Sequence, residues 1–507
     1  MRTVMGELMC RLRRAGTSWT GMPDRQWSRR LQTAPFRDGG SQPWRTNYFA
    51  VLISAVTATI GYGIYVGHRK KVEAATVPRK PETLQLQENS RWNWRNLKPI
   101  TIEEAKKRAR DLCLRIKDES GSPGLSVAVT VDGELVYEDG MGYADVENRV
   151  PCAPHTVMRI ASISKPLTVS AAARLLEEGK LDLDKPVQEY VKYFPVKYFE
   201  GKEVKITTRH LVSHLSGIRH YSKTRPDDKK EEEKESDSEE GWKKKRKGEF
   251  DLKEYYIKDP FPSVQKAVEM FCNDDLLYEP GKKYLYSTHA FTLLSAVVEE
   301  VSGEPFTKVM NNLFHELGLQ YTSLDENSPI MYHRARYYKK DDKGRLINAP
   351  YVDNSYKWAG GGFQSTVGDL VKYGNALLYS HSSGGNLPRG LHLPSTMRML
   401  WSPVPQTESW DRDAKYGMGW SVTPRQINYP FCNAKRFYVS HTGGAVGASS
   451  ALLIIPDEGE DDSPVGTVVT KPPPLGTVVA ILVNMQEVGL KGTAMEIALL
   501  FQRTRSS

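Results

Sequence analysis

The sequence predicts an α+β protein, an α/β sandwich in which an antiparallel β-sheet is flanked by helices and carries an inserted, mostly helical lobe. Two observations support this fold class. Strand-like segments occur near both ends of the folded part of the chain, whereas residues 167–378 have mainly helical patterns joined by long connections. The expected architecture is one antiparallel sheet built from both chain ends, with the helical lobe inserted between them.

The elements at the two ends can be placed in order. Residues 102–116 have helical periodicity. Residues 124–131 and 135–138 alternate like strands and flank Asp132-Gly133, a dipeptide that favours a tight hairpin turn. Three further strands are expected near the C-terminus, at 438–440, 445–455 and 477–483.

Residues 99–507 are long enough for one large domain, and two segments within it have the composition of insertions. Residues 223–250 consist almost entirely of Lys, Arg, Glu, Asp and Ser, which predicts a solvated loop. Residues 457–475 are acidic and then rich in proline, and they separate two strands that would otherwise form a short hairpin. Either insertion could be a docking surface, but tolerated extra length is the simpler interpretation.

The N-terminal region carries the charge of the chain. The formal net charge is +9, and this excess lies before residue 72; the rest of the chain is formally neutral. A nucleic-acid partner is therefore not expected. Residues 1–47 are rich in arginine, poor in acidic residues and contain Ser and Trp, which is typical of a mitochondrial presequence. A disordered basic tail is the alternative.

Residues 48–66 carry no charge and are about as long as a membrane span, although their Ser, Thr and Gly content makes them a weak one. Residues 67–98 are polar and interrupted by proline, as in a linker. A presequence followed by a marginal span indicates association with the mitochondrial inner membrane or delivery to the intermembrane space.

The first candidate for chemistry is Ser162, which is followed by Lys165 one helical turn later. This S-x-x-K spacing puts both side chains on one helix face, where a desolvated amine can take the proton of a serine hydroxyl. An apolar stretch at 157–160 precedes the serine, and an apolar helical segment at 167–176 follows. Ser162 is therefore expected at a helix N-terminus, where backbone N–H groups favour the negative charge that develops in acyl transfer.

Two other patterns have simpler explanations. Ser263 and Lys266 repeat the S-x-x-K spacing, but Ser263 follows a proline and precedes an amphipathic stretch, which predicts a helix N-cap. His210 and His214 have a metal-compatible spacing but no nearby carboxylate. No metal and no other cofactor is expected.

Two more stretches follow Ser162 and Lys165 in a recognisable order. Tyr286-Ser287-Thr288 comes after Pro280-Gly281, and His441-Thr442-Gly443 directly follows the strand predicted at 438–440. Supporting matches are His214-Leu215-Ser216-Gly217, Ala359-Gly360-Gly361-Gly362, and Tyr416-Gly417-Met418-Gly419-Trp420. From about residue 102 onward the chain resembles the serine β-lactamase and penicillin-binding protein family, in its class C and D-alanyl-D-alanine carboxypeptidase branch.

The resemblance implies a β-lactamase/transpeptidase-like fold and a serine hydrolase, most simply a peptidase. Ser162 would form an acyl-enzyme, while Lys165 and Tyr286 would move the proton. The N–H groups of Ser162 and Gly444 would form an oxyanion hole. The expected substrate and oxyanion residues are Thr288, His441, Thr442, Gly443 and Gly444.

Two positions depart from the family pattern. Thr288 stands where asparagine is usual, and His441 stands where β-lactamases usually carry lysine. The permanent cation for a β-lactam carboxylate is therefore missing. A peptide or ester substrate is expected instead of an antibiotic.

With its presequence and charged insertion, the chain resembles the mitochondrial members of this family in animals. That resemblance implies a homo-oligomer or filament with a part in membrane organisation and lipid metabolism. Two alternatives remain. The cleft could be vestigial in a structural scaffold protein, or the enzyme could be an esterase that acts on lipids or small esters.

Overall fold

The computed structural model describes residues 98–221, 253–382, 390–409, 414–424, 437–457 and 474–504. The expected presequence, hydrophobic segment and linker lie outside these residues apart from Lys98, and the two expected insertions lie almost wholly outside them. Within the described ranges, no helix combines the length and apolar character that crossing a bilayer requires.

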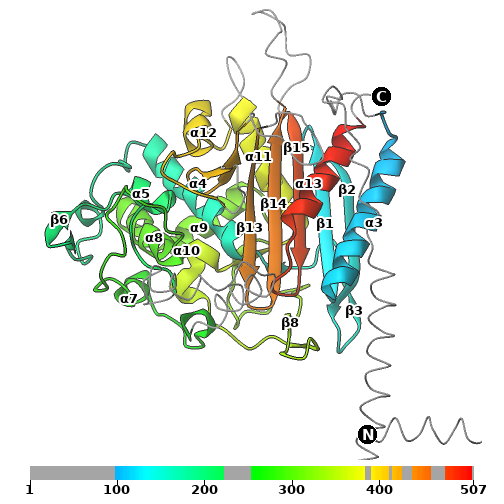
Figure 1. Cartoon of the computed structure of the whole chain (residues 1–507), viewed down its shortest axis with the longest axis horizontal. Coiled ribbons are helices and arrows are strands. Elements are labelled where there is room, and N and C mark those ends of the chain that lie inside the picture. Colours follow the sequence, from blue (N-terminus) through cyan, green and yellow to red (C-terminus); the bar gives the residue numbers. More distant parts are fainter. Residues whose placement is uncertain are drawn as a thin grey trace, which may run out of the picture. The chain divides into compact units, whose positions relative to one another are not determined.

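An eight-stranded antiparallel sheet forms the centre of the protein, in the order β11-β12-β13-β14-β15-β1-β2-β3 (Figure 1). The strands from the start of the domain are β1 (Gly124–Val131), β2 (Glu134–Asp145) and β3 (Val150–Pro151). Those from its end are β11 (Lys415–Tyr416), β12 (Ser421–Thr423), β13 (Tyr438–Ala445), β14 (Ala448–Pro456) and β15 (Gly476–Val483). Because β1 pairs with β15, the two chain ends close one sheet, which confirms the predicted fold class.

The hairpin between β1 and β2 turns at Asp132 and Gly133, whose φ angles of 51° and 83° both lie in the left-handed region. This is the backbone of a type I′ turn, which Asp-Gly tolerates. The prediction of this hairpin is confirmed, although β2 extends seven residues beyond the predicted end at 138. The strand predicted at 445–455 is instead two strands, because the chain turns at Gly447, where φ is 74°.

Two helices cover one face of the sheet. They are α3 (Ile102–Ser120), whose beginning agrees with the prediction, and α13 (Lys491–Gln502), and they lie side by side (Figure 1). Alternate residues of the central strands pack against them, such as Val127 of β1 and Ile481 of β15. The intervening Ala128 packs into the core on the other face. The central strands are therefore buried on both sides, as in a sandwich.

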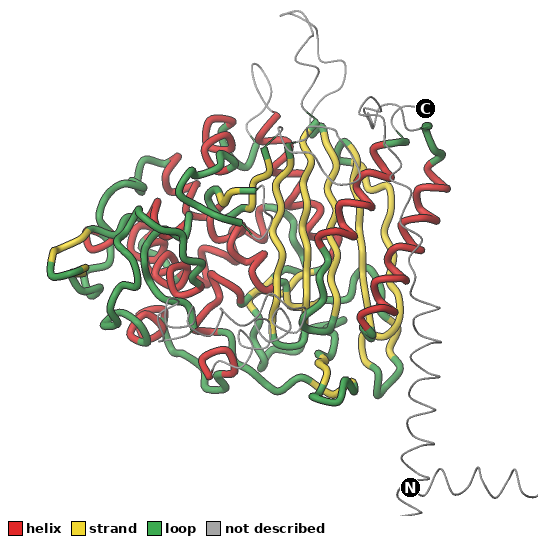
Figure 2. The backbone as a smooth tube through the Cα atoms, viewed as in Figure 1, coloured by secondary structure: helices red, strands yellow, loops and turns green. Residues whose placement is uncertain are grey.

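The opposite face carries the helical lobe, which Figure 2 shows beside the sheet. Its helices are α4 (Ser164–Glu177), α5 (Thr208–Val212), α7 (Val264–Glu269), α8 (Thr288–Ser302), α9 (Phe306–Glu316), α10 (Trp358–Gly361), α11 (Val367–Ser382) and α12 (Pro394–Leu400). Short strands that the sequence patterns did not predict form three small sheets: β4 (Met158–Arg159) with β10 (Phe363–Ser365) and β7 (Ser323–Leu324), β5 (Lys197–Phe199) with β6 (Lys202–Val204), and β8 (Tyr338–Lys340) with β9 (Leu346–Asn348). The fold therefore places the turn before α4 between the sheet and the helices of the lobe.

Candidate active site

Ser162 lies in a 3₁₀ turn, Ala161–Ile163, that leads from β4 into α4. It is therefore at the start of the helix, as its sequence context predicts. The residue before it, Ala161, has a φ of 49°, in the left-handed region that residues with a Cβ seldom occupy. Such a conformation costs about 1 kcal/mol or more and persists only where surrounding contacts hold it.

Several contacts hold this turn against the β13–β14 hairpin. The Ser450 hydroxyl donates to the carbonyl of Ile160 at 2.8 Å, and Arg159 Nη1 donates to the carbonyl of Val446 at 2.9 Å. Arg159 also forms a buried ion pair with Asp325 at 2.6 Å. Buried charges that are paired in this way resist displacement, because separating them leaves an uncompensated charge. The segment that carries Ser162 is thus fixed from two sides.

Lys165 is fully buried, and its ammonium group is held by three donated hydrogen bonds. It donates to Ser162 Oγ at 3.2 Å, to the carbonyl of Gly360 at 2.5 Å and to Thr288 Oγ1 at 3.5 Å. Its Nζ also lies 4.6 Å from the centre of the Tyr286 ring. The lysine amine therefore stands next to the serine hydroxyl, within reach of its proton.

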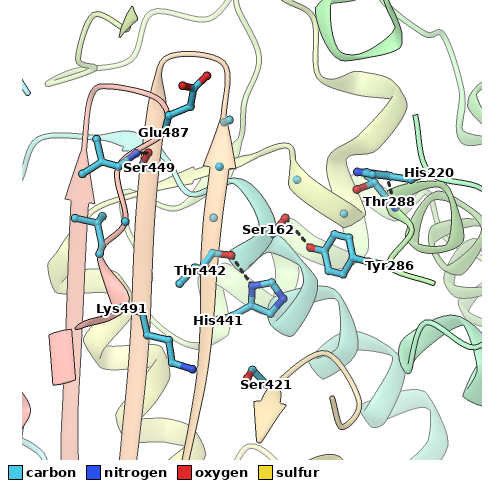
Figure 3. A pocket seen from close by; sticks show the side chains of 18 of the residues that line it. Ser162, His220, Tyr286, Thr288, Ser421, His441, Thr442, Ser449, Glu487 and Lys491 are labelled. Carbon is cyan, nitrogen blue, oxygen red and sulfur yellow. Dashed lines mark hydrogen bonds between the residues drawn. The ribbon is translucent and has the colours of Figure 1, made fainter. Parts of the chain in front are cut away.

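Tyr286 lies just before α8 and contacts Ser162. Its hydroxyl donates to Ser162 Oγ at 2.9 Å, as the dashed line in Figure 3 marks. The side chain is only partly buried, so its hydroxyl meets the serine in the open cavity and not in the protein core. Ser162, Lys165 and Tyr286 therefore converge, although 124 residues separate the serine from the tyrosine.

Two imidazoles hold the corner that carries Tyr286. Nδ1 of His214 accepts the backbone N–H of Ser287 at 3.2 Å, and Nδ1 of His220 accepts that of Thr288 at 3.2 Å. Burial, together with the neighbouring Lys165 charge, lowers the pKa of His214 well below its usual value. Burial and nearby cations do the same to the pKa of His220. Both rings are therefore neutral near pH 7, as an acceptor nitrogen must be.

The convergent groups open into a cavity of about 600 Å³. All the expected substrate and oxyanion residues line it, namely Thr288, His441, Thr442, Gly443 and Gly444. Figure 3 shows Ser162 and Tyr286 in contact with each other on one side of this cavity, and His441 and Thr442 of β13 beside them. Residues of the loop before α13, from Glu487 to Leu490, contribute another part of the wall.

His441 is buried and neutral. Its Nε2 accepts the hydroxyl of Tyr416 at 2.9 Å, and its Nδ1–H donates to the carbonyl of Thr442 at 2.7 Å. Burial, with the Lys165 charge as the next cause, lowers the pKa of His441 to about 3. The residue that replaces the usual lysine therefore supplies no positive charge to the cavity at neutral pH.

Sequence patterns do not indicate several other residues of the cavity wall, among them His220, Tyr255, Lys357 and Tyr416. Tyr416 belongs to a motif that supported the resemblance, but its contact with His441 spans 25 residues and no local pattern indicates it. Tyr255 donates to the carbonyl of Gly444 at 3.0 Å, across 189 residues. Contacts of this kind depend on the tertiary fold, so sequence spacing does not reveal them.

The patterns that were set aside have structural roles. Ser263 caps α7, and its Oγ accepts the backbone N–H of Lys266 at 3.2 Å, which confirms the predicted N-cap. Nδ1 of His210 accepts the N–H of Thr207 in a capping box at the start of α5. His214 has a different partner, described above. In the ranges that the structure describes, no cluster of three or more His, Cys, Asp or Glu side chains could hold a metal ion.

Comparisons with known proteins agree with this architecture. Residues 106–500 match the family model described as Beta-lactamase. The chain is 49% identical over 440 residues to the human protein named serine beta-lactamase-like protein LACTB, mitochondrial, covering 78% of this chain and 80% of that protein. The mouse protein of the same name is 48% identical over 446 residues, with the same coverage of each chain.

Among solved structures, the fold resembles the octameric penicillin-binding protein homologue from Pyrococcus abyssi, with a TM-score of 0.58 and 22% identity. The match covers 78% of this chain and 77% of that one. At this level of identity the likeness concerns the fold alone. With the family model spanning most of the chain and two mammalian relatives near 50% identity, the chain belongs to the β-lactamase family of serine hydrolases.

Proposed function

We propose that the protein is a mitochondrial serine peptidase that works through an acyl-enzyme on Ser162. The observation that supports this most directly is the pair of hydrogen bonds to Ser162 Oγ, from Lys165 at 3.2 Å and from Tyr286 at 2.9 Å, at the wall of an open cavity. A nucleophile in contact with two groups that can move its proton is what acyl transfer requires.

In the proposed first step, Ser162 Oγ attacks the carbonyl carbon of the substrate while its proton passes to Tyr286 or Lys165. The Lys165 ammonium, 4.6 Å from the Tyr286 ring, favours a phenolate over a neutral phenol. The same group then returns the proton to the leaving nitrogen or oxygen as the carbonyl bond to it breaks. Water then attacks the carbonyl carbon of the resulting ester and gives one proton to Tyr286 or Lys165; as the bond from that carbon to Ser162 Oγ breaks, this proton returns to the serine oxygen.

Gly444 is the proposed second donor of the oxyanion hole, beside the N–H of Ser162. The carbonyl of Gly444 accepts the Tyr255 hydroxyl at 3.0 Å. In an extended strand the N–H and C=O of one residue point to the same side, so the Gly444 N–H points away from β14 as well. Tyr255 lines the cavity, which supports an N–H directed to the same space. Losing one such donor costs roughly 10²-fold or more in rate.

A peptide is the proposed substrate, and an ester of a lipid or small acid is the alternative. Neutral His441 gives the cavity no cation at the place where β-lactamases usually carry lysine, so hydrolysis of β-lactams is not the proposed role. The acyl-enzyme chemistry is the same for amides and esters. Purified protein assayed against a peptide library and a panel of esters distinguishes them.

The proposed location is the mitochondrial intermembrane space or inner membrane. The relatives named as mitochondrial and the arginine-rich 1–47 segment support a mitochondrial location. The uncharged 48–66 segment supports sorting to the inner membrane or the space behind it. Mass spectrometry of the mature N-terminus tests this: cleavage before residue 48 predicts an anchored form, and cleavage after residue 66 predicts a released form.

Self-association is also proposed, as an oligomer or filament with a part in membrane organisation and lipid metabolism. The support is the resemblance to animal mitochondrial members of the family, and one protein of the same fold is an octamer. Sedimentation of the purified protein over a range of concentrations tests assembly, and a single monomeric species at all of them would contradict it.

A fluorophosphonate probe tests the enzyme proposal against the scaffold alternative. Such probes form a covalent bond only with an activated serine, so we expect labelling of the wild type and none of Ser162→Ala. Ser263→Ala is the matched control, because it removes the serine of the second S-x-x-K pattern from a helix cap. Folded wild-type protein that resists labelling would instead indicate a vestigial cleft.

A further inference from the structure

Lys357 lines the same cavity as Ser162 but takes no part in the chemistry described above. It ends a 3₁₀ turn (Ser355–Lys357) that leads into α10, and it precedes by three residues the Gly360 carbonyl that holds Lys165. Its side chain is 4% exposed, whereas lysines are almost never buried without a partner. A buried lysine in the wall of a catalytic cavity therefore requires an explanation.

Three tyrosine rings surround the ammonium group of Lys357. Its Nζ lies 4.5 Å from the ring centre of Tyr255, 5.1 Å from that of Tyr356 and 5.4 Å from that of Tyr221. The hydroxyl groups of two of these rings are directed elsewhere, since Tyr255 donates to Gly444 and Tyr356 donates to the carbonyl of Glu254. The cation therefore meets ring faces, which attract it but do not neutralise it.

Asp325 is the carboxylate that acts on the charge of Lys357, but it already binds other groups. Asp325 accepts hydrogen bonds from Arg159 at 2.6 Å and from the Asn354 amide at 2.5 Å. Among the residues that the structure describes, Lys357 forms no ion pair and its side chain makes no hydrogen bond. Burial and the Arg159 charge lower the pKa of Lys357 to about 7, against the opposing effect of Asp325. At neutral pH the cavity wall thus carries a partly charged lysine that, within the described residues, has no ion-paired or hydrogen-bonded counter-charge.

We propose that Lys357 and its tyrosine cage form an anion subsite that binds a carboxylate of the substrate during acyl transfer at Ser162. The anion would reach Lys357 from the cavity, whose wall Lys357 forms together with Tyr221 and Tyr255. In this proposal Lys357, in the 3₁₀ turn before α10, supplies the positive charge that neutral His441 on β13 does not supply. The proposal rests on the proposed hydrolase function and specifies the class of substrate that it takes.

Matched substrates that differ only in charge test this subsite. Aminomethylcoumarin amides of N-acetylglutamate and N-acetylglutamine place the charge on the acyl side of the cleaved bond. The esters 3-carboxyphenyl butyrate and 3-carbamoylphenyl butyrate place it on the leaving group. A charge-assisted hydrogen bond predicts that kcat/KM for the charged member of one pair exceeds that of its neutral partner by about tenfold or more. No preference in either pair would overturn the proposal.

Lys357→Met removes the charge while keeping a side chain of similar length. We expect the preference for the charged substrate to fall to about one, with the rate on the neutral partner much less affected. Lys491→Met is the matched control, because Lys491 is another lysine in the cavity wall. If the preference for the charged substrate survives in Lys357→Met, or disappears in Lys491→Met, a group other than Lys357 binds the substrate carboxylate.

Equilibrium binding separates failure of this subsite from failure of the hydrolase proposal, since it requires no turnover and no Lys357 variant. Calorimetry with Ser162→Ala compares monomethyl glutarate, which carries a carboxylate, with methyl glutaramate, which does not. The groups facing Lys357 are Arg159, Asp325, His220, Tyr221, Tyr255 and Tyr356.

Three of these neighbours have shifted pKa values, and none of the three shifts brings a charge change between pH 6 and 8: the pKa of His220 lies well below its usual value, that of Arg159 is raised, and that of Tyr356 is well above its usual value. Lys357, with a pKa of about 7, is expected to titrate there. Binding of the carboxylate should therefore take up a proton and weaken about tenfold from pH 6 to pH 8. Equal binding of both ligands, or binding that is independent of pH, would refute the subsite even if the wild type labels with a fluorophosphonate.

Discussion

Gly443 of β13 packs so closely against Ile160 that a Cβ at residue 443 would overlap the carbonyl oxygen of Ile160. It would also overlap the Ser450 hydroxyl that binds this same oxygen, and it would lie 2.9 Å from the Cβ of Ala161. The close approach of the backbone that carries Ser162 therefore requires a glycine at residue 443. Its role is to let the sheet and the Ser162 turn meet.

Gly443→Ala should accordingly displace the turn that precedes Ser162. We expect a loss of kcat/KM of about 10²-fold, because a misplacement of about 1 Å has effects of this size, with unfolding made easier by about 1–3 kcal/mol. Steady-state kinetics and urea unfolding measure the two effects. Gly492→Ala is the control, since no atom lies within 4 Å of the Cβ it would gain; it should leave kcat/KM nearly unchanged and, because Gly492 lies in α13, should raise stability by up to about 1 kcal/mol.

Tyr286→Phe removes the hydroxyl that contacts Ser162 and keeps the ring, which packs 4.2 Å from the ring of His214. If this hydroxyl moves the serine proton, kcat/KM should fall by about 10²–10⁴-fold while the melting temperature changes little. Tyr284→Phe makes the same chemical change two residues away, beside the same histidine. Equal activity in the two variants would remove Tyr286 from the mechanism.

Lys165→Met should separate activity from stability. The amine contacts Ser162, so its loss should lower kcat/KM by about 10²-fold or more. Stability should change by less than about 2 kcal/mol, because removing a buried charge offsets the lost hydrogen bond to Gly360. Lys266→Met changes the lysine of the second S-x-x-K pattern, whose side chain is exposed on α7, and is expected to be fully active. A large loss of stability in Lys165→Met would indicate a structural lysine.

Short sequence patterns were sufficient to predict the turns and helix caps that depend only on neighbouring residues. The hairpin at Asp132-Gly133 and the cap at Ser263 were predictable because each depends on residues within a few positions. The division of the last strands was not, since Gly443 and Gly444 have low strand propensity and the sequence gives no reason to extend β13 through them. Pairing with Ser450 and Ser449 of β14 extends it to Ala445.

The candidate site divides in the same way. The convergence of Ser162, Lys165 and Tyr286 was predictable because these residues lie in short motifs whose order carries information. Lys357 was not, because a lysine is ordinarily solvated and its tyrosines come from residues as distant as Tyr221. The neutral state of His441 depends on burial and on Tyr416, and both are properties of the tertiary structure.

That neutral state makes stability depend on pH. The pKa of His441 is about 3 in the folded protein and near 6.5 when unfolded. Between these values the unfolded chain binds a proton that the folded protein does not, so the free energy of unfolding falls as the pH is lowered below about 6.5. Above that pH the stabilisation is fully present.

For one such histidine the loss between pH 7.5 and 5.5 is about 1 kcal/mol. Urea unfolding of the wild type and of His441→Gln at these two pH values measures it, because the contributions of His214 and His220 are common to both proteins and cancel in the comparison. The glutamine has no proton to bind, so the variant should lose about 1 kcal/mol less than the wild type on acidification. An equal loss in both would mean that His441 already carries a proton in the folded protein, and that the hydroxyl of Tyr416 does not donate to its Nε2.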